Sequence, residues 1–343
     1  MIRTSWIGLL SLFSSLAAGA CAVSGTAAQT GDIAPTNPPG IEFMDISIPG
    51  GPIGKMCEPL SPDPSPEAFP ALVFIGGSAG GLSFAEPAAR LACAEGYTAL
   101  ALAYWGYDGL PGALEEIPLE YFDQSIEWLA EQPGVRPGAI GLVGYSRGGE
   151  GALLVASRNQ ALAAVVALVP GAHVGPNINF RDFFNPRSAW SLGGAPIPYA
   201  TTRPARPGEN WQDVMKDLPP PSPAQARTDF ESLLALPSAA AAEIPVHDIG
   251  VPILMVGAGQ DDVWASSAMV SFMADALDRK AFPHEVQAMY YGGSGHGFML
   301  DSLNKAEGDA EGQRAWQATF SFLGRHLGPG ATAAQASPED TIP

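Results

Sequence analysis

The sequence predicts an α/β fold with a mostly parallel, doubly wound sheet. Short apolar runs alternate along the chain with longer amphipathic stretches, a pattern typical of buried parallel strands joined by helices. Two segments depart from it: a pair of short runs near the N-terminus, and a Pro-rich segment over residues 174–245. We therefore expect one α/β domain over residues 41–327, with an antiparallel hairpin at its start and a cap insertion at 174–245.

The hairpin is predicted first along the chain. Residues 41–48 alternate apolar and polar side chains, Pro-Gly-Gly-Pro at 49–52 indicates a turn, and residues 53–57 form the partner strand. Residues 61–66 carry proline at every second position, which predicts a stiff, exposed connection into the main sheet.

The remaining elements alternate strand and helix. Apolar runs predict strands at residues 71–75, 99–103, 139–143, 162–169, 253–256 and 286–290. The stretches between them predict helices at residues 84–95, 119–131, 147–158 and 265–278, with a closing helix at 310–327. Within the insertion only residues 224–236 show a weak helical pattern.

Composition limits the function classes. The chain has 343 residues, 46% of them hydrophobic and 15% charged, which is enough to bury a large core. A formal net charge of −18 argues against binding to nucleic acid or anionic membranes, because both need concentrated Lys and Arg.

The insertion has the opposite charge balance. Residues 174–228 contain six basic and four acidic residues, a net charge of +2. The basic residues are Arg181, Arg187, Arg203, Arg206, Lys216 and Arg227. One interpretation is a cap that attracts an anionic substrate or leaving group, and the other is an ordinary solvated loop.

Both ends of the chain show features of export or disorder. Residues 1–20 resemble a signal peptide, with Arg3, a short apolar run and a small-residue cleavage site, and residues 21–40 read as a linker. Cys21 follows directly and resembles a bacterial lipoprotein processing site, so a lipid anchor at Cys21 is the only membrane contact we expect. The tail at residues 328–343 lacks periodic apolar residues and predicts disorder. We expect an exported protein, either secreted or periplasmic and lipid-anchored.

The other two cysteines are Cys57 and Cys93, which could pair in an oxidising compartment or stay free. The sequence shows no metal-ligand spacing, and we expect neither a metal nor an organic cofactor.

The strongest functional motif is Gly144-Tyr145-Ser146-Arg147-Gly148, between a predicted strand and a predicted helix. A serine between two glycines at such a corner is typical of a nucleophile elbow. A second match, Gly-Gly-Ser-Ala-Gly at residues 76–80, occurs too early in the chain for an α/β-hydrolase nucleophile. It matches the earlier loop that supplies a backbone N–H to the oxyanion. We therefore expect Ser146 as the nucleophile and the backbone N–H groups of Arg147, Ser78 and Ala79 as oxyanion donors.

A serine nucleophile needs a base and an acid. His296 lies in a Gly-rich loop after the last predicted strand, where such a base is presented. His173 follows the strand at 162–169 and is a candidate substrate contact, whereas surface or packing roles are expected for His247, His284 and His326. The acid is Asp261 or Asp262, since both follow the strand at 253–256 and give the order Ser, Asp, His.

The motifs resemble those of a known family, the acyl-CoA thioesterases together with bile acid-CoA:amino acid N-acyltransferase, whose catalytic domain is an α/β-hydrolase of the dienelactone-hydrolase-like kind. The resemblance covers residues 70–173 and 244–299 and rests on the sequences at 76–82, 99–107, 119–122, 144–150 and 259–264. It implies a triad of Ser146, His296 and the second aspartate, Asp262. It also implies an acyl ester or thioester as the small-molecule substrate.

Three features depart from this family. Residues 31–70 are too few for the immunoglobulin-like domain of its animal members, Arg147 replaces a frequent lysine, and the insertion is longer. We expect an exported serine-dependent hydrolase of acyl esters or thioesters. The alternatives are an acyltransferase on the same scaffold, a simple carboxylesterase that does not act on CoA thioesters, and a non-enzymatic surface-binding lipoprotein that keeps only the fold.

Overall fold

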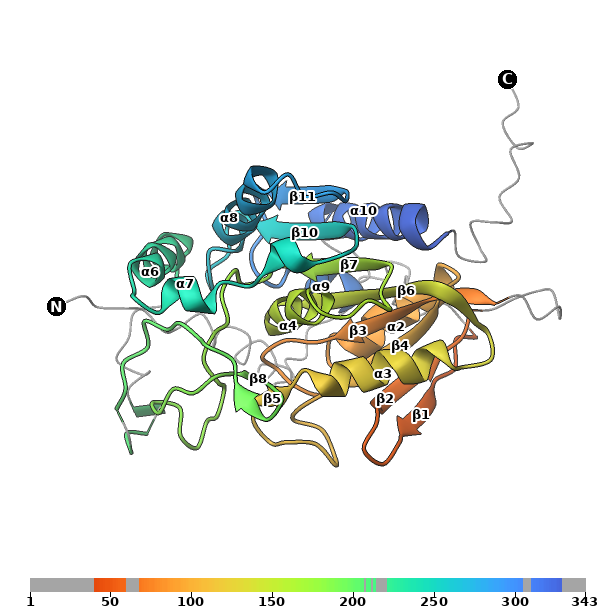
Figure 1. The fold of residues 1–343 in the computed structure, drawn as a ribbon, viewed down its shortest axis with the longest axis horizontal. Coiled ribbons are helices and arrows are strands. Elements are labelled where there is room, and N and C mark those ends of the chain that lie inside the picture. Colours follow the sequence, from red (N-terminus) through yellow and green to blue (C-terminus); the bar gives the residue numbers. More distant parts are fainter. Residues whose placement is uncertain are drawn as a thin grey trace, which may run out of the picture.

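The computed structural model of the chain describes residues 40–59, 68–206, 208–210, 212–213, 221–304 and 310–328. An eight-stranded sheet with the strand order β1-β2-β4-β3-β6-β7-β10-β11 forms its centre (Figure 1). The strands are β1 Met44–Ser47, β2 Ile53–Cys57, β3 Phe69–Ile75, β4 Thr98–Ala103, β6 Val135–Tyr145, β7 Ala164–Leu168, β10 Ile253–Ala258 and β11 Val286–Tyr291. Within this sheet, β4, β3, β6, β7, β10 and β11 each pair in parallel with the next strand, so the predicted α/β-hydrolase sheet is confirmed.

The N-terminal hairpin is also confirmed. Strands β1 and β2 pair antiparallel, and β2 pairs antiparallel with β4. Strand β1 begins at Met44 rather than at residue 41. The register pairs four of its residues with β2, from Met44 opposite Met56 to Ser47 opposite Ile53. Cys57, at the end of β2, forms a disulfide with Cys93 in helix α2, Ala85–Ala94.

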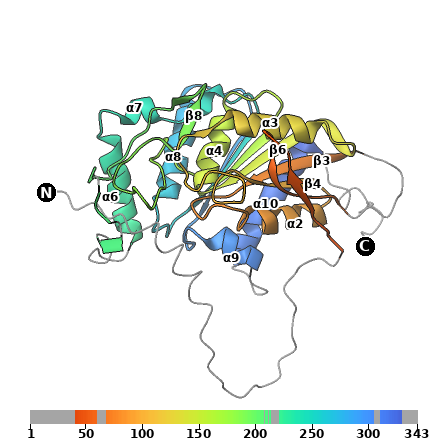
Figure 2. The same ribbon diagram turned by 90° about the horizontal axis from the view of Figure 1, so that it is seen from below.

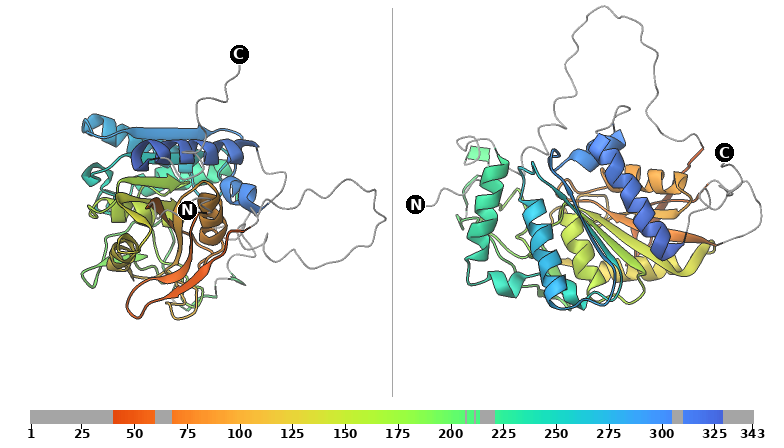
Figure 3. Two further views of the ribbon diagram at one scale, coloured as in Figure 1. Left: turned by 90° about the vertical axis from the view of Figure 1, so that its right-hand side faces the viewer. Right: turned by 90° about the horizontal axis from the view of Figure 1, so that it is seen from above.

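Helices cover both faces of the sheet. One face carries α3 (Glu120–Ala130), α4 (Arg147–Ala156) and α8 (Ser266–Arg279), and the other carries α2, α9 (Phe298–Asn304) and α10 (Ala310–Leu327). Figure 2 and the right-hand view of Figure 3 show the sheet between these two layers. All helices predicted from the sequence are present, with bounds that differ by at most two residues.

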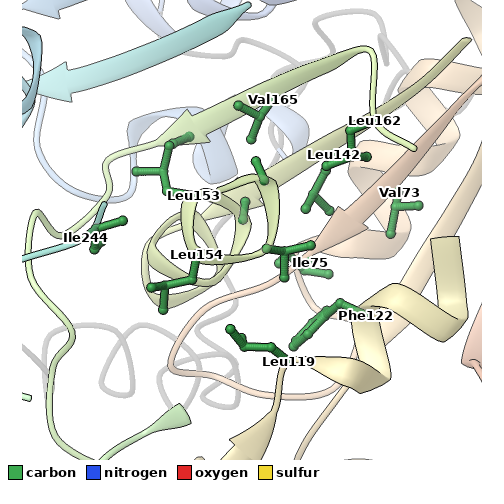
Figure 4. Close-up of a cluster of buried hydrophobic side chains, with 14 of the residues drawn as sticks. Val73, Ile75, Leu119, Phe122, Leu142, Leu153, Leu154, Leu162, Val165 and Ile244 are labelled. Atoms are coloured by element: carbon green, nitrogen blue, oxygen red, sulfur yellow. The ribbon is translucent and has the colours of Figure 1, made fainter. Parts of the chain in front are cut away.

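The core lies between the sheet and its helical layers. Figure 4 shows Val73, Leu142 and Val165 of three neighbouring strands against Phe122 of α3 and Leu153 of α4. All five side chains are fully buried. Strands buried on both faces need apolar side chains at every position, and this requirement explains why they read as continuous apolar runs.

The insertion lies beyond the carboxyl ends of the parallel strands, on the side toward which the arrows of β7 and β10 point (Figure 1). It contains β8 (Trp190–Leu192), β9 (Ala195–Pro196), α6 (Pro223–Leu234) and α7 (Ala239–Ala242), followed by a 3₁₀ turn at Val246–Asp248. Strand β8 pairs with β5 (Ile117–Pro118) and β9 in a small second sheet. Sequence reasoning missed β5, β8 and β9, because two or three residues cannot show a period of two.

Several sequence predictions lie outside the described residues. They concern the leader at 1–20, the linker up to residue 39, the connection at 61–66 and the tail after residue 328. Within the residues that the structure describes, no helix is both long and apolar enough to cross a membrane.

Candidate active site

The sequence-predicted site residues converge on one edge of the sheet. The register places the last residues of β3, β6, β7, β10 and β11 side by side. The loops that follow these strands therefore meet at their carboxyl ends, which is where open α/β sheets bind ligands. Ser78, Ser146, His173, Asp261 and His296 all lie in or directly after these loops.

Ser146 occupies a strained turn between β6 and α4. Its backbone has φ +57° and ψ −119°, a conformation that non-glycine residues rarely adopt. A Cβ on Gly144 would lie 2.1 Å from the carbonyl oxygen of Gly148, and a Cβ on Gly148 would lie 2.2 Å from the oxygen of Gly76. Only glycine fits at these two positions, which explains the spacing of the motif.

The second glycine cluster lies directly against this turn. A Cβ on Gly77 would lie 2.8 Å from the Cβ of Ser146. The loop is held by the Tyr104 hydroxyl, which donates to the Gly76 carbonyl at 2.8 Å, and by the Trp105 indole, which donates to the Gly77 carbonyl at 3.3 Å. Ser78 is buried in this loop, and neighbouring Ala79 is exposed. The two glycine motifs, whose serines at 78 and 146 are 68 residues apart in sequence, are thus neighbours in space.

A hydrogen-bonded chain joins three side chains. The Ser146 Oγ lies 2.9 Å from Nε2 of His296, and Nδ1 of His296 lies 2.9 Å from Oδ2 of Asp261. With Nδ1 protonated and donating to the carboxylate, Nε2 is left to accept the serine proton. All three residues are at least 97% buried, since their exposed fractions are 1%, 3% and 2%. This arrangement can activate a serine hydroxyl.

The prediction that Asp262 is the acid is wrong. His296 contacts Asp261, because the turn after β10 directs that residue inward. Oδ1 of Asp261 accepts the backbone N–H groups of Val263 and Trp264 at 3.0 and 3.1 Å, which leaves Oδ2 facing the imidazole. The same carboxylate of Asp261 thus shapes the turn before α8 and holds His296. Asp262 is half-buried.

Aromatic residues fix the position of His296. The Tyr145 hydroxyl donates to the His296 carbonyl at 2.9 Å, and the Tyr145 ring stacks on Phe84. The Trp264 ring meets the imidazole edge-on at 5.5 Å, and its indole N–H donates to the Val169 carbonyl at 3.0 Å. Burial raises the pKa of Tyr145 far above its ordinary value, so its hydroxyl stays protonated and remains a donor.

A cavity of about 150 Å³ is lined by neighbours of the triad, among them Arg147, which follows Ser146, and Trp264, which contacts His296. Ser78, Arg147 and Trp264 line its side near the serine, and the insertion supplies much of the remaining wall, including Arg203 and Phe230. His173 also lines it, and lies between the rings of Phe230 and Phe272 at 6.1 and 5.4 Å. Burial lowers the pKa of His173 to about 4, so its imidazole is neutral at physiological pH, and neither ring nitrogen has a partner among the described residues.

A buried polar network stands behind the cavity. Nη1 of Arg147 donates to Oε2 of Glu150, and Oε1 of Glu150 accepts the Trp190 indole at 2.6 Å and the Gly175 N–H at 3.0 Å. Burial raises the pKa of Glu150, and the charge of Arg147 and these hydrogen bonds oppose that shift. Arg147 was predicted only as a backbone donor, and the network of its side chain was missed. The spacing of three residues between Arg147 and Glu150 on a helix was the available signal.

The remaining histidines lie away from the triad. His247 and His284 are exposed, and His326 is partly buried on α10, where Nε2 lies 3.0 Å from a carboxylate oxygen of Glu285. Among the described residues no group of His, Cys, Asp and Glu side chains could hold a metal ion.

The sheet order and the serine in its strained turn define an α/β-hydrolase. The chain belongs, more particularly, to the family described as BAAT / Acyl-CoA thioester hydrolase C terminal, whose model matches residues 117–300. The structure of a thermostable esterase from Pseudomonas putida ECU1011 superposes with a TM-score of 0.54 at 19% identity, covering 84% of each chain, which supports the fold.

Curated relatives match most of this chain. Mouse acyl-coenzyme A thioesterase 2, mitochondrial, is 29% identical over 247 residues, 71% of this chain and 48% of the relative. Human acyl-coenzyme A thioesterase 6 is 25% identical over 297 residues, 78% of this chain and 62% of the relative. The chain therefore spans about half to three-fifths of the length of these relatives.

Proposed function

We propose that the protein is a serine hydrolase that cleaves an acyl ester or thioester through an acyl-enzyme. The single observation that carries the proposal is the hydrogen-bonded chain from Ser146 through His296 to Asp261, on a strained turn of the sheet. The family and its acyl-CoA thioesterase relatives support the acyl substrate.

The chemistry follows from the geometry. Nε2 of His296 takes the Ser146 proton as Oγ attacks the acyl carbonyl, and Asp261 stabilises the imidazolium that forms. The backbone N–H of Arg147, at the start of α4, and those of the Ser78–Ala79 loop hold the oxyanion. The imidazolium then protonates the leaving alcohol or thiol, and a water molecule activated by His296 releases the acid.

The protein is also proposed to work outside the cytoplasm. The leader at residues 1–20 supports export, and the Cys57–Cys93 disulfide supports an oxidising compartment. A lipid anchor at Cys21 belongs to the same proposal. Because acyl-CoA is a cytoplasmic metabolite, export favours a thioester or ester with a different leaving group.

The test uses a fluorophosphonate probe and p-nitrophenyl esters. We expect the probe to label the protein at Ser146, and the Ser146→Ala and His296→Ala variants to lose turnover by roughly 10⁴-fold or more. Mass spectrometry locates the label, and circular dichroism shows that the variants fold. A folded protein that neither reacts with the probe nor hydrolyses any ester would contradict the proposal.

A further inference from the structure

Arg203 is a buried cation without a buried anion to match it. Only 4% of its surface is exposed. Its Nη groups donate to the carbonyl and side-chain oxygens of Asn177 at 2.6 to 3.1 Å, and its guanidinium lies 4.4 Å from the centre of the Phe183 ring. Among the described residues no carboxylate oxygen lies within 4 Å of this guanidinium, and its buried Nε has no hydrogen-bond partner.

A second cation lies near the first. Arg147 is also 4% exposed, lines the same cavity and has a buried Nε without a partner among the described residues. Burial lowers the pKa of Arg203 to about 10, and the charge of Arg147 acts in the same direction. Arg203 therefore remains protonated at neutral pH, so the cavity wall holds two positive charges.

Two carboxylates, Glu150 and Asp229, also line the cavity, but among the described residues neither forms an ion pair with Arg203. Glu150 already accepts from Arg147, Trp190 and Gly175 with its two oxygens. Asp229, on α6, is half-buried and accepts from Gln225. Removing a cation from water costs several kcal/mol unless an anion compensates it. Because no carboxylate of the described residues pairs with Arg203, an anionic ligand beside it would offset part of that cost.

We infer that this cavity binds a carboxylate carried at the far end of a short acyl chain, with Arg203 as its principal partner. The inference rests on the proposed function, since Ser146 would attack the other end of that chain. A cavity of about 150 Å³ holds a ligand about the size of benzene, which suits a short chain and not a large leaving group. Apolar walls from Phe230 and Met269 would contact its methylene groups.

The substrate preference tests the inference. Mono-p-nitrophenyl adipate and p-nitrophenyl hexanoate have the same chain length and leaving group, but only the adipate ends in a carboxylate. We expect kcat/KM for the adipate to exceed that for the hexanoate by about tenfold or more, the effect of one hydrogen-bonded charge. The Arg203→Met variant should reduce this ratio to about one. Arg203→Lys, which keeps the charge but not the planar pair of N–H donors, should reduce it to an intermediate value.

The matched control is Arg206→Met, because Arg206 lies in the same segment but is half-exposed and paired with Glu209. It should leave the ratio unchanged. The hexanoyl ester of 3-hydroxy-4-nitrobenzoate carries the anion on the leaving group instead. The enzyme could prefer this ester to p-nitrophenyl hexanoate in an Arg203-dependent way and show no preference for the adipate. That result would overturn the acyl-side assignment. Equal rates on all three esters would overturn the anion site itself.

Binding separates this inference from the proposed function. Calorimetry with free adipate and the folded Ser146→Ala protein requires no turnover. Adipate should bind, its isosteric but uncharged diamide, adipamide, should bind at least about tenfold more weakly, and Arg203→Met in the same background should remove the difference. If the wild-type protein fails the fluorophosphonate test while adipate binds, the proposed function fails and the anion site stands. If the probe labels Ser146 but adipate does not bind, the anion site fails alone.

Discussion

The two adjacent aspartates after β10 show how finely the acid position is set. Asp261 and Asp262 have the same chemistry and the same place in chain order, but only Asp261 reaches His296. The backbone N–H groups of Val263 and Trp264 hold one oxygen of its carboxylate and thereby aim the other. No sequence pattern reports which neighbour a tight turn directs inward, and the family pattern led to the wrong one.

At the residue scale, Asp261→Asn should lower kcat for p-nitrophenyl esters by about 10³- to 10⁴-fold, because an amide cannot hold His296 in the reactive tautomer. The isosteric Asp262→Asn should lower it by less than about tenfold, since its side chain does not contact the imidazole. Steady-state kinetics on the two variants checks this. A greater loss in Asp262→Asn would refute the assignment that the geometry makes.

At the element scale, the site depends on how β3, β6 and α4 meet. Gly144, Gly148 and Gly77 permit backbone contacts that any Cβ would block. These contacts bring the start of α4 and the loop after β3 to the same serine. The sequence predicted both loops, because strand-to-helix corners with glycine are recognisable. It did not predict β5, β8 and β9, which form only because the insertion folds back onto the loop before α3.

Also at the element scale, the disulfide should have a measurable effect on the free energy of unfolding. It links the end of β2 to α2 across 36 residues. The Cys57→Ala, Cys93→Ala double variant should lower the free energy of unfolding by about 2–4 kcal/mol, because the unfolded chain regains the freedom of that loop. Urea unfolding measures this. Ester hydrolysis should persist, since neither cysteine lines the cavity; equal stability of both proteins would show that the link contributes nothing.

At the scale of the whole molecule, an acidic protein has two buried arginines in the wall of its cavity. The chain carries a net charge of −18, but Arg147 and Arg203 lie buried beside the triad. Residues 174–228 have a basic charge balance, which by itself fits both a solvated loop and an anion-attracting cap. The structure separates the members of that set. Arg203 is buried, whereas Arg187 and Arg206 are about half-exposed and paired with carboxylates.

The export proposal concerns the whole chain. Expressed in full in a bacterial host, the mature protein should lack residues 1–20, and its N-terminal peptide should begin at Cys21 with the added mass of a lipid. Mass spectrometry of membrane and soluble fractions measures both. The Cys21→Ala variant should move the protein out of the membrane fraction. An intact chain that still carries Met1 in the cytosol would contradict export.

The sequence by itself determined the α/β-hydrolase class, the positions of the main-sheet strands and of the longer helices, and the candidates Ser146 and His296. These features depend on local patterns: apolar periodicity and the small residues that a sharp corner requires. Only the tertiary structure decided between Asp261 and Asp262, paired Cys57 with Cys93, and placed Arg203 in the cavity wall. Each of these depends on where a side chain points relative to a distant segment. That direction follows from packing across the whole fold, and local residue order does not contain it.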